Sequence, residues 1–232
     1  MADSLTPELK HHAQSALLDA FRFRRAIKAF DDSRELAPED FEFILEAARL
    51  TASSNGLEPW NIFVLREPAL RAKFVQRTAV NPEQAAKASH LVAITAKTAK
   101  GLDPDTSPYL AHIAAEVKGM TPDQIAAWRP GFKVFLADRM EVLGSDDAMF
   151  GYTARQAYMA LQSMLVAASV IAVDSCPLEG LIHSQATAVL AEAGLIDPET
   201  DRFAVAAVFG HRAADPKRPQ ARRPLGEVVI YS

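Results

Sequence analysis

The segment "AARLTASSNGLEPWNIFVL", residues 47–65, changes character twice along its length. Its first residues complete a helix expected over residues 37–50, which Pro38 opens and in which apolar side chains recur at helical spacing. Ser, Asn and Gly then crowd the stretch up to Pro59, which is typical of a loop. The β-prone run after it predicts a strand over residues 60–65. A helix, a loop and a strand in direct succession indicate a layer of helices against a sheet.

The rest of the chain continues this interleaving of helices and strands, which favours an α/β or α+β layered domain. Residues 104–142 are expected to be mostly helical, with breaks near Gly119 and at Pro130–Gly131. Residues 176–180, "CPLEG", are expected to form a turn, and the last eight residues form a β-prone tail. Further helices are expected over residues 6–22, 68–77, 147–172 and 184–195, and further strands over residues 90–98 and 202–210.

Composition describes an ordinary globular chain of 232 residues with 25 Lys and Arg against 29 Asp and Glu. This acidic balance disfavours general binding to nucleic acid, which requires a broad basic face. The chain has one cysteine, Cys176, so it cannot form an internal disulfide, and the N-terminus shows no apolar signal region. We therefore expect a cytoplasmic protein.

The most apolar stretch, residues 157–173, is too short for a membrane span and contains Gln162, Ser163 and Ser169. We interpret it as part of a buried helix and expect no membrane association. Because this stretch is apolar nearly all round, we expect a second subunit to cover it in a homodimer.

Common catalytic and binding motifs are missing from the sequence. It contains no G-x-G-x-x-G, no G-x-x-x-x-G-K-[ST] and no G-x-S-x-G, so a Rossmann site, a P-loop and a hydrolase elbow are poorly supported. Its six histidines lack H-E-x-x-H spacing, and we expect no metal site.

A basic segment, "AFRFRRAIKAF" at residues 20–30, contrasts with the acidic balance of the chain. Arginine suits anion sites because its planar fork matches phosphate oxygens in a bidentate way. A second basic stretch, "DPKRPQARRP", lies far along the chain at residues 215–224. The alternatives are that these arginines are solvated surface residues or that they bind nucleic acid.

The order of several segments resembles that of the FMN-dependent nitroreductase family, in particular the bacterial oxygen-insensitive NAD(P)H nitroreductases. The segments that carry the resemblance are "RRAIKAF" at 24–30, "AARLTASSNGLEPW" at 47–60, Asn81 ahead of "ASHLVAITAKT", Gln156, "PLEG" at 177–180 and "RPQARRPLGEVV" at 218–229.

This resemblance implies an α+β nitroreductase-like fold, with a central mixed or antiparallel sheet flanked by helices. It implies one FMN-binding domain over residues 1–232 and an intertwined homodimer with its sites at the interface. Residues 104–142 are expected to form a helical excursion over the substrate face. Phe132 and Phe135 in it are candidates for stacking on substrate, or equally for the core.

The resemblance also implies a role for each matched residue in binding FMN. Arg24, Arg25 and Arg222 would bind the 5′-phosphate, and Lys28 would reach the pyrimidine edge near N1 and O2. The backbone of residues 179–180 would pass over N5. Asn81 would contact the pyrimidine side, Gln156 the ribityl chain, and Ser53 and Asn55 would come from the other subunit. The implied cofactor-binding residues are Arg24, Arg25, Ala26, Lys28, Ser53, Asn55, Asn81, Gln156, Pro177, Leu178, Glu179, Gly180 and Arg222.

Four positions depart from the family pattern. Ala26 replaces a Ser, Glu58 replaces a Gln, and Gln84 and Gln220 each replace a Lys. We expect these changes to weaken FMN binding without removing the site, since a hydrogen bond to a charged group contributes about 1.5–3 kcal/mol.

The activity implied is that of an FMN-dependent NAD(P)H oxidoreductase with ping-pong kinetics. Hydride would pass from NADH or NADPH to flavin N5 and then to a small nitroaromatic or quinone-type acceptor, and no side chain need act as acid or base. The alternatives are a flavin or dihydropteridine reductase, a reductive dehalogenase, or a non-catalytic flavin-binding protein.

Overall fold

The computed structural model describes residues 6–79 and 81–232, and its centre is a four-stranded antiparallel sheet. The two middle strands are buried almost throughout, as expected of nearly continuous apolar runs. The strands lie in the order β1-β2-β4-β3, which confirms the expected α+β class and the central sheet. Their bounds are β1 Trp60–Val64, β2 His90–Lys97, β3 Asp174–Leu178 and β4 Asp201–Gly210.

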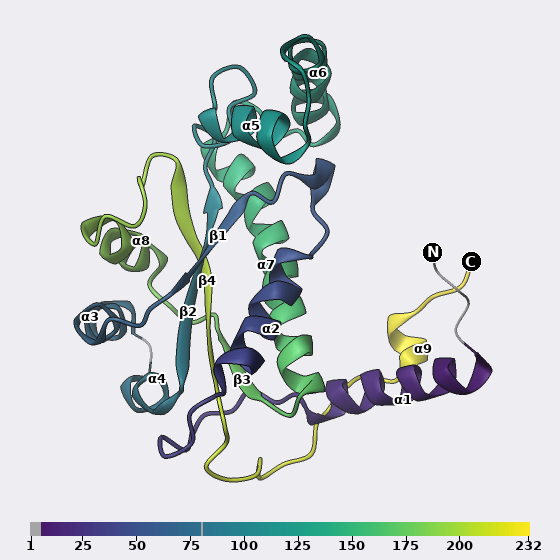
Figure 1. Cartoon of the computed structure of the whole chain (residues 1–232), viewed down its shortest axis with the longest axis vertical. Coiled ribbons are helices and arrows are strands. Elements are labelled where there is room, and N and C mark those ends of the chain that lie inside the picture. Colours follow the sequence, from purple (N-terminus) through teal and green to yellow (C-terminus); the bar gives the residue numbers. More distant parts are fainter. Residues whose placement is uncertain (1–5, 80) are drawn as a thin grey trace.

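Two long helices, α2 (Pro38–Arg49) and α7 (Asp146–Val170), cover one face of the sheet (Figure 1). The α2 stripe, centred on Ile44, packs into the same apolar cluster as the buried side of α7. Its own chain therefore buries most of α7, and only scattered apolar side chains such as Met159 and Val170 remain exposed. The apolar character of α7 alone thus does not require a second subunit.

Three shorter helices cover the opposite face of the sheet, so the domain has three layers (Figure 1). Phe74 and Phe203 meet edge to face in this second apolar cluster, between the helices and β4. The sheet is therefore sealed on both faces. These helices are α3 Pro68–Thr78, α4 Pro82–Lys87 and α8 His183–Glu192.

The segment between β2 and α7 forms the expected helical excursion at one end of the sheet (Figure 1). It has a separate apolar core, which includes Leu110 and Leu136. The break near Gly119 is confirmed, because its φ of +64° ends the first helical stretch. The break expected at Pro130 is wrong: Pro130 lies inside a continuous helix, because packing of the excursion core outweighs the lost hydrogen bond. The elements are α5 Pro108–His112, π-helices Ile113–Val117 and Phe135–Arg139, and α6 Pro122–Val134.

The helix α1 (Pro7–Phe23) projects away from the three layers, and the C-terminal segment runs back beside it (Figure 1). The β-prone tail does not form a strand. It contains the short helix α9 (Leu225–Val228), because the tail lies beside α1, away from both edges of the sheet, and its amides bond locally. Ile230 and Tyr231 are 87% and 91% exposed.

The "CPLEG" turn is a second correction, because its first three residues belong to β3. Pro177 is tolerated there since β3 is an edge strand of the sheet and pairs with β4 alone. A 3-10 turn, Ser54–Gly56, lies in the loop before β1. Within residues 6–79 and 81–232 no helix is both long and apolar enough to cross a membrane.

Candidate functional site

A basic cleft of about 650 Å³ lies where the segment after α1 meets the segment after β4. The two segments are almost two hundred residues apart in the sequence, and the fold brings the two basic stretches together. We call this site the basic cleft. Its lining residues are Arg24, Arg25, Ala26, Ile27, Lys28, Ala29, Ala214, Asp215, Pro216, Lys217, Arg218, Gln220, Ala221 and Arg222.

Positive charge in the basic cleft is poorly compensated. Burial, and then the neighbouring Arg222, lowers the pKa of Arg24. In the described part of the chain, no carboxylate lies within ion-pair distance of Arg24, Arg25, Lys28 or Arg222. The one acidic residue that lines the cleft, Asp215, contacts Arg212 at 3.2 Å. The cleft therefore suits an anion.

Hydrogen bonds tie the two walls of the cleft together. Arg25 donates from Nη1 to the carbonyl of Arg218 at 2.7 Å. Gln220 stands where the family pattern has a lysine. Its Nε2 donates to the carbonyls of Phe21 and Arg24 at 3.3 and 3.4 Å. Its role is therefore to hold the end of α1 against the cleft wall. Lys217 and Arg218 supply cations in its place.

Lys28 lines the basic cleft and contacts β3. Its Nζ donates to Sγ of Cys176 at 3.2 Å, and Cys176 is fully buried. The preceding residue, Ile27, donates its backbone N–H to the carbonyl of Ser175 at 3.1 Å. Its carbonyl accepts from Nε2 of Gln84 at 2.6 Å. The segment is thus fixed between β3 and α4.

Asn81 is the N-cap of α4 and lies next to this segment in the hydrogen-bond network. Its side-chain oxygen accepts from the backbone N–H of Gln84 at 3.2 Å. Asn81 does not line the basic cleft. It therefore acts on the cleft through Gln84, which α4 presents to the carbonyl of Ile27.

Residues 177–180 follow Cys176 directly, and none of them lines the basic cleft. Pro177 and Leu178 end β3. The carboxylate of Glu179 accepts a hydrogen bond from the hydroxyl of Tyr158 at 2.5 Å. Burial, and then the bond to Glu179, raises the pKa of Tyr158. Nothing lies within 4 Å of a Cβ built on Gly180, so the backbone there is open to a bound molecule.

The remaining predicted residues, Ser53, Asn55 and Gln156, gather elsewhere in the chain. Gln156 on α7 accepts from the backbone N–H of Ser54 at 2.8 Å, and Oγ of Ser53 accepts from Glu58 at 2.9 Å. Asn55 has a left-handed φ of 54°, and its carbonyl accepts from a lysine of the excursion. None of these residues lines the basic cleft. Within one chain, Ser53, Asn55 and Gln156 therefore lie apart from the basic cleft.

The two phenylalanines proposed for substrate stacking occupy the excursion. Phe132 is 3% exposed, and its ring lies between those of Trp128 and Phe135, with centroids 4.8 and 6.2 Å away. Phe132 is thus buried in the core of the excursion, which favours the core role. Phe135 is partly buried against the same cluster.

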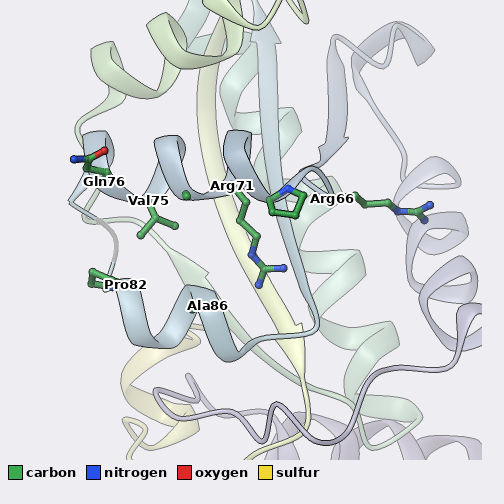
Figure 2. A pocket seen from close by; sticks show the side chains of 8 residues that line it. Arg66, Arg71, Val75, Gln76, Pro82 and Ala86 are labelled. Carbon is green, nitrogen blue, oxygen red and sulfur yellow. The ribbon is translucent and has the colours of Figure 1, made fainter.

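A larger groove of about 690 Å³ lies between α3 and α4, on the side chains shown in Figure 2. It is mostly apolar, and Arg66 points away from it (Figure 2). Arg71 reaches toward α4, where its guanidinium donates to the carbonyls of Ala85, Ala88 and Ser89. This arginine caps the end of α4, so the groove offers less to an anion than the basic cleft does.

The sequence did not predict that Cys176 and Tyr158 would contact residues of the site. The contact of Cys176 with Lys28 joins residues 148 apart in the sequence, and that of Tyr158 with Glu179 arises from packing of α7 on β3. Among the described residues no group of three or more His, Cys, Asp or Glu is placed to hold a metal ion.

Comparison with known proteins gives a consistent result. The model of the Nitroreductase family matches residues 21–211. A Bacillus subtilis protein named "Putative NAD(P)H nitroreductase YfkO" is 38% identical over 94% of this chain and 98% of its own length. The crystal structure of "a putative nitroreductase in complex with FMN" from Exiguobacterium sibiricum superposes with a TM-score of 0.70 at 18% identity, covering 93% of this chain and 97% of that one.

A second solved structure is the NADPH:FMN oxidoreductase from Vibrio harveyi complexed with NAD+. It superposes with a TM-score of 0.64 at 18% identity and covers 93% of this chain and 76% of that one. At this identity the two structures support the fold, whereas the family rests on the matched model and the sequence relative.

Proposed function

Because the chain belongs to the Nitroreductase family, we propose that it is an FMN-dependent oxidoreductase that takes electrons from NADH or NADPH. The observation that carries this proposal is the basic cleft, which gathers cations from two distant segments, and no carboxylate of the described residues pairs with Arg24, Arg25, Lys28 or Arg222. The names of the relatives add support, since the B. subtilis protein is named for NAD(P)H and the E. sibiricum structure contains FMN.

The residues of the cleft fit the chemistry of FMN. Arg24, Arg25 and Arg222 offer the planar donors that suit a phosphate dianion. Lys28 would face the pyrimidine edge, where a fixed cation favours the negative charge of the reduced flavin. A volume of about 650 Å³ is in the range of small-molecule and cofactor sites. When bound, FMN would supply two-electron hydride chemistry, while this chain's residues bind and orient it.

We further propose that the complete site forms in a homodimer. Ser53, Asn55 and Gln156 share one cluster, so a second copy of the chain would bring all three to the basic cleft together. Apolar side chains that such a contact would cover are exposed on α1, on α2 and in the tail: Leu17, Leu18, Phe21, Phe43, Ile230 and Tyr231. The working location that we propose is the cytoplasm.

The acceptor that we propose is a small nitroaromatic or a quinone. Donor and acceptor would use the same open side of the site in turn, which gives ping-pong kinetics with parallel double-reciprocal lines. Assays with nitrofurazone, menadione and free FMN as acceptors distinguish a nitro or quinone reductase from a flavin reductase. Intersecting double-reciprocal lines would contradict the shared-site mechanism.

The cofactor is tested on purified, dialysed protein by its visible absorption spectrum. We expect flavin bands, and we expect NADH or NADPH to bleach them in the absence of air. A protein that stays colourless after addition of FMN would overturn the proposal.

A matched pair of variants then locates the cofactor. Arg222 lines the cleft, whereas its neighbour Arg223 does not. Arg222→Ala should weaken FMN binding by about ten- to one-hundredfold, because a charge-assisted contact contributes about 1.5–3 kcal/mol. Arg223→Ala should leave the Kd within about twofold on the same scale. Equal effects of the two substitutions on the Kd would place the phosphate elsewhere.

A further inference from the structure

The segment that carries Lys28 is held from two sides by buried polar groups of neighbouring elements. On one side β3 supplies the carbonyl of Ser175, which accepts from the N–H of Ile27, and Ala26 forms a parallel bridge to the same residue. On the other side α4 supplies Gln84, which donates to the carbonyl of Ile27 at 2.6 Å. Both backbone groups of Ile27 are thus bonded to rigid elements.

Gln84 is well placed for this task. It is 3% exposed, and it lies in the first turn of α4, where the Asn81 cap bonds its backbone N–H. A lysine here, as in the family pattern, would add a second cation. The glutamine instead fixes the backbone next to Lys28 and adds no cation of its own.

Cys176 holds the other end of the Lys28 side chain. Its Sγ is the hydrogen-bond partner that the structure gives to Nζ of Lys28, at 3.2 Å, and its side chain is fully buried in β3. A thiol is a weak acceptor and can be neutral, unlike a carboxylate. The contact therefore orients the ammonium without the full neutralisation that an ion pair would bring. The remaining N–H groups stay available to a ligand in the cleft.

We propose that Gln84 and Cys176 are positioning residues for Lys28, which together fix its ammonium at the wall of the basic cleft and leave its charge directed at the bound flavin. This inference rests on the proposed FMN site. Its consequence is a specific one: Gln84 and Cys176 set how much more tightly the protein binds reduced FMN than oxidised FMN. They do so through Lys28, without touching the cofactor themselves.

The test is the midpoint potential of bound FMN. This potential reports the ratio of the affinities of the protein for reduced and oxidised FMN. Lys28→Met sets the scale, and we expect it to reduce the preference for reduced FMN by about tenfold. For a two-electron couple this is a fall of about 30 mV. Cys176→Ala and Gln84→Leu should each move the preference in the same direction by about threefold, since they loosen the ammonium without removing it.

Two controls separate positioning from general damage. Cys176→Ser keeps a hydrogen-bonding side chain and should retain the potential of the wild type. Cys176→Ala in the Lys28→Met background should cause no further shift, because residues that act through one group are not additive. In the flavin-free protein, backbone hydrogen exchange over residues 26–29 should be faster in Gln84→Leu than in the wild type.

The outcomes are distinguishable. Bound FMN whose potential is unchanged in Cys176→Ala and Gln84→Leu overturns this inference and leaves the proposed function intact. A shift that persists in the Lys28→Met background also overturns it, because the effect would then bypass Lys28. A wild-type protein that binds no FMN overturns both proposals. If Cys176→Ala does not fold, Gln84→Leu and the exchange measurement decide.

Discussion

The ion pair between Asp174 and Arg212 is expected to be worth far more to the fold than a second ion pair made by the same arginine. Asp174 is 4% exposed at the start of β3, and it accepts from Nη2, Nε and the backbone N–H of Arg212 at 2.6, 2.9 and 2.8 Å. Asp215 contacts Nη1 of Arg212 at 3.2 Å, but its side chain is 93% exposed. Two aspartates on one arginine thus differ in burial.

Asp174→Asn should lower the free energy of unfolding by about 2–4 kcal/mol. Removing one partner of a buried pair costs about 3–5 kcal/mol, because the other charge remains buried without compensation. We reduce this figure because the Arg212 side chain is 18% exposed and also stacks on the Phe23 ring, 4.5 Å from its centroid. Asp215→Asn should change the free energy by less than about 1 kcal/mol, as exposed ion pairs do.

Urea denaturation of both variants and the wild type, at one protein concentration, measures these differences. The slope of free energy against urea should stay constant, so the midpoints alone should move. Equal losses for Asp174→Asn and Asp215→Asn would refute the assignment of the stabilisation to burial. Because Arg212 lies two residues before Ala214, which lines the basic cleft, Asp174→Asn should also weaken FMN binding, whereas Asp215→Asn removes a negative charge from the cleft and should not.

Three further predictions follow from single positions. Gly101→Ala should destabilise the protein by about 2–4 kcal/mol, since its Cβ would lie 2.1 Å from the carbonyl oxygen of Thr200. Gly151→Ala in α7 should stabilise the protein by about 0.5–1 kcal/mol, because nothing lies within 4 Å of the added Cβ. Thermal unfolding of the two variants and the wild type measures both changes. Hydrogen bonds from Arg77 and Lys73 of α3 lower the pKa of Glu192 to about 2 from an ordinary value of 4.5. The stability that the Glu192 carboxylate contributes to the fold is therefore present above pH 4.5 and is lost as the pH falls toward 2. Acid titration of wild type and Glu192→Gln should therefore converge in that window. Burial, and then two nearby arginines, lowers the pKa of His90. The stability that the neutral imidazole contributes is therefore complete above about pH 6.5 and declines as the pH falls further. Imidazole NMR titration and denaturation at pH 7.5 and 5.5 measure this change.

Most of the fold could be predicted from local patterns. Every long helix and every strand expected from periodicity lies within three residues of its observed bounds, because Pro at the helix starts and apolar runs in the strands act locally. The errors occur where non-local contacts decide. Pro130 stays helical because the excursion core packs around it, and Pro177 joins a strand because it lies at the sheet edge. The C-terminal tail pairs with neither edge of the sheet, although its composition favours a strand, because it lies beside α1.

The candidate site was predictable in part. The two basic stretches stood out against an acidic chain, and the structure places them on one cleft. The roles of the substituted residues were not predictable. Gln220 caps the end of α1 and Gln84 holds the backbone of Ile27, and both contacts join segments far apart in the sequence. Likewise, a single sequence contains no signal that Ser53 and Gln156 form a cluster apart from the cleft.

The separate core of the excursion has an evolutionary consequence. Its apolar residues pack on one another at the end of the sheet and belong to neither cluster that seals the two faces. Substitutions there should be decoupled energetically from the arginines of the basic cleft, none of which belongs to this core. A lineage could therefore exchange the residues of this module while the residues of the basic cleft stay constant. Such modularity would let one scaffold change the end of its sheet without having to evolve the basic cleft again.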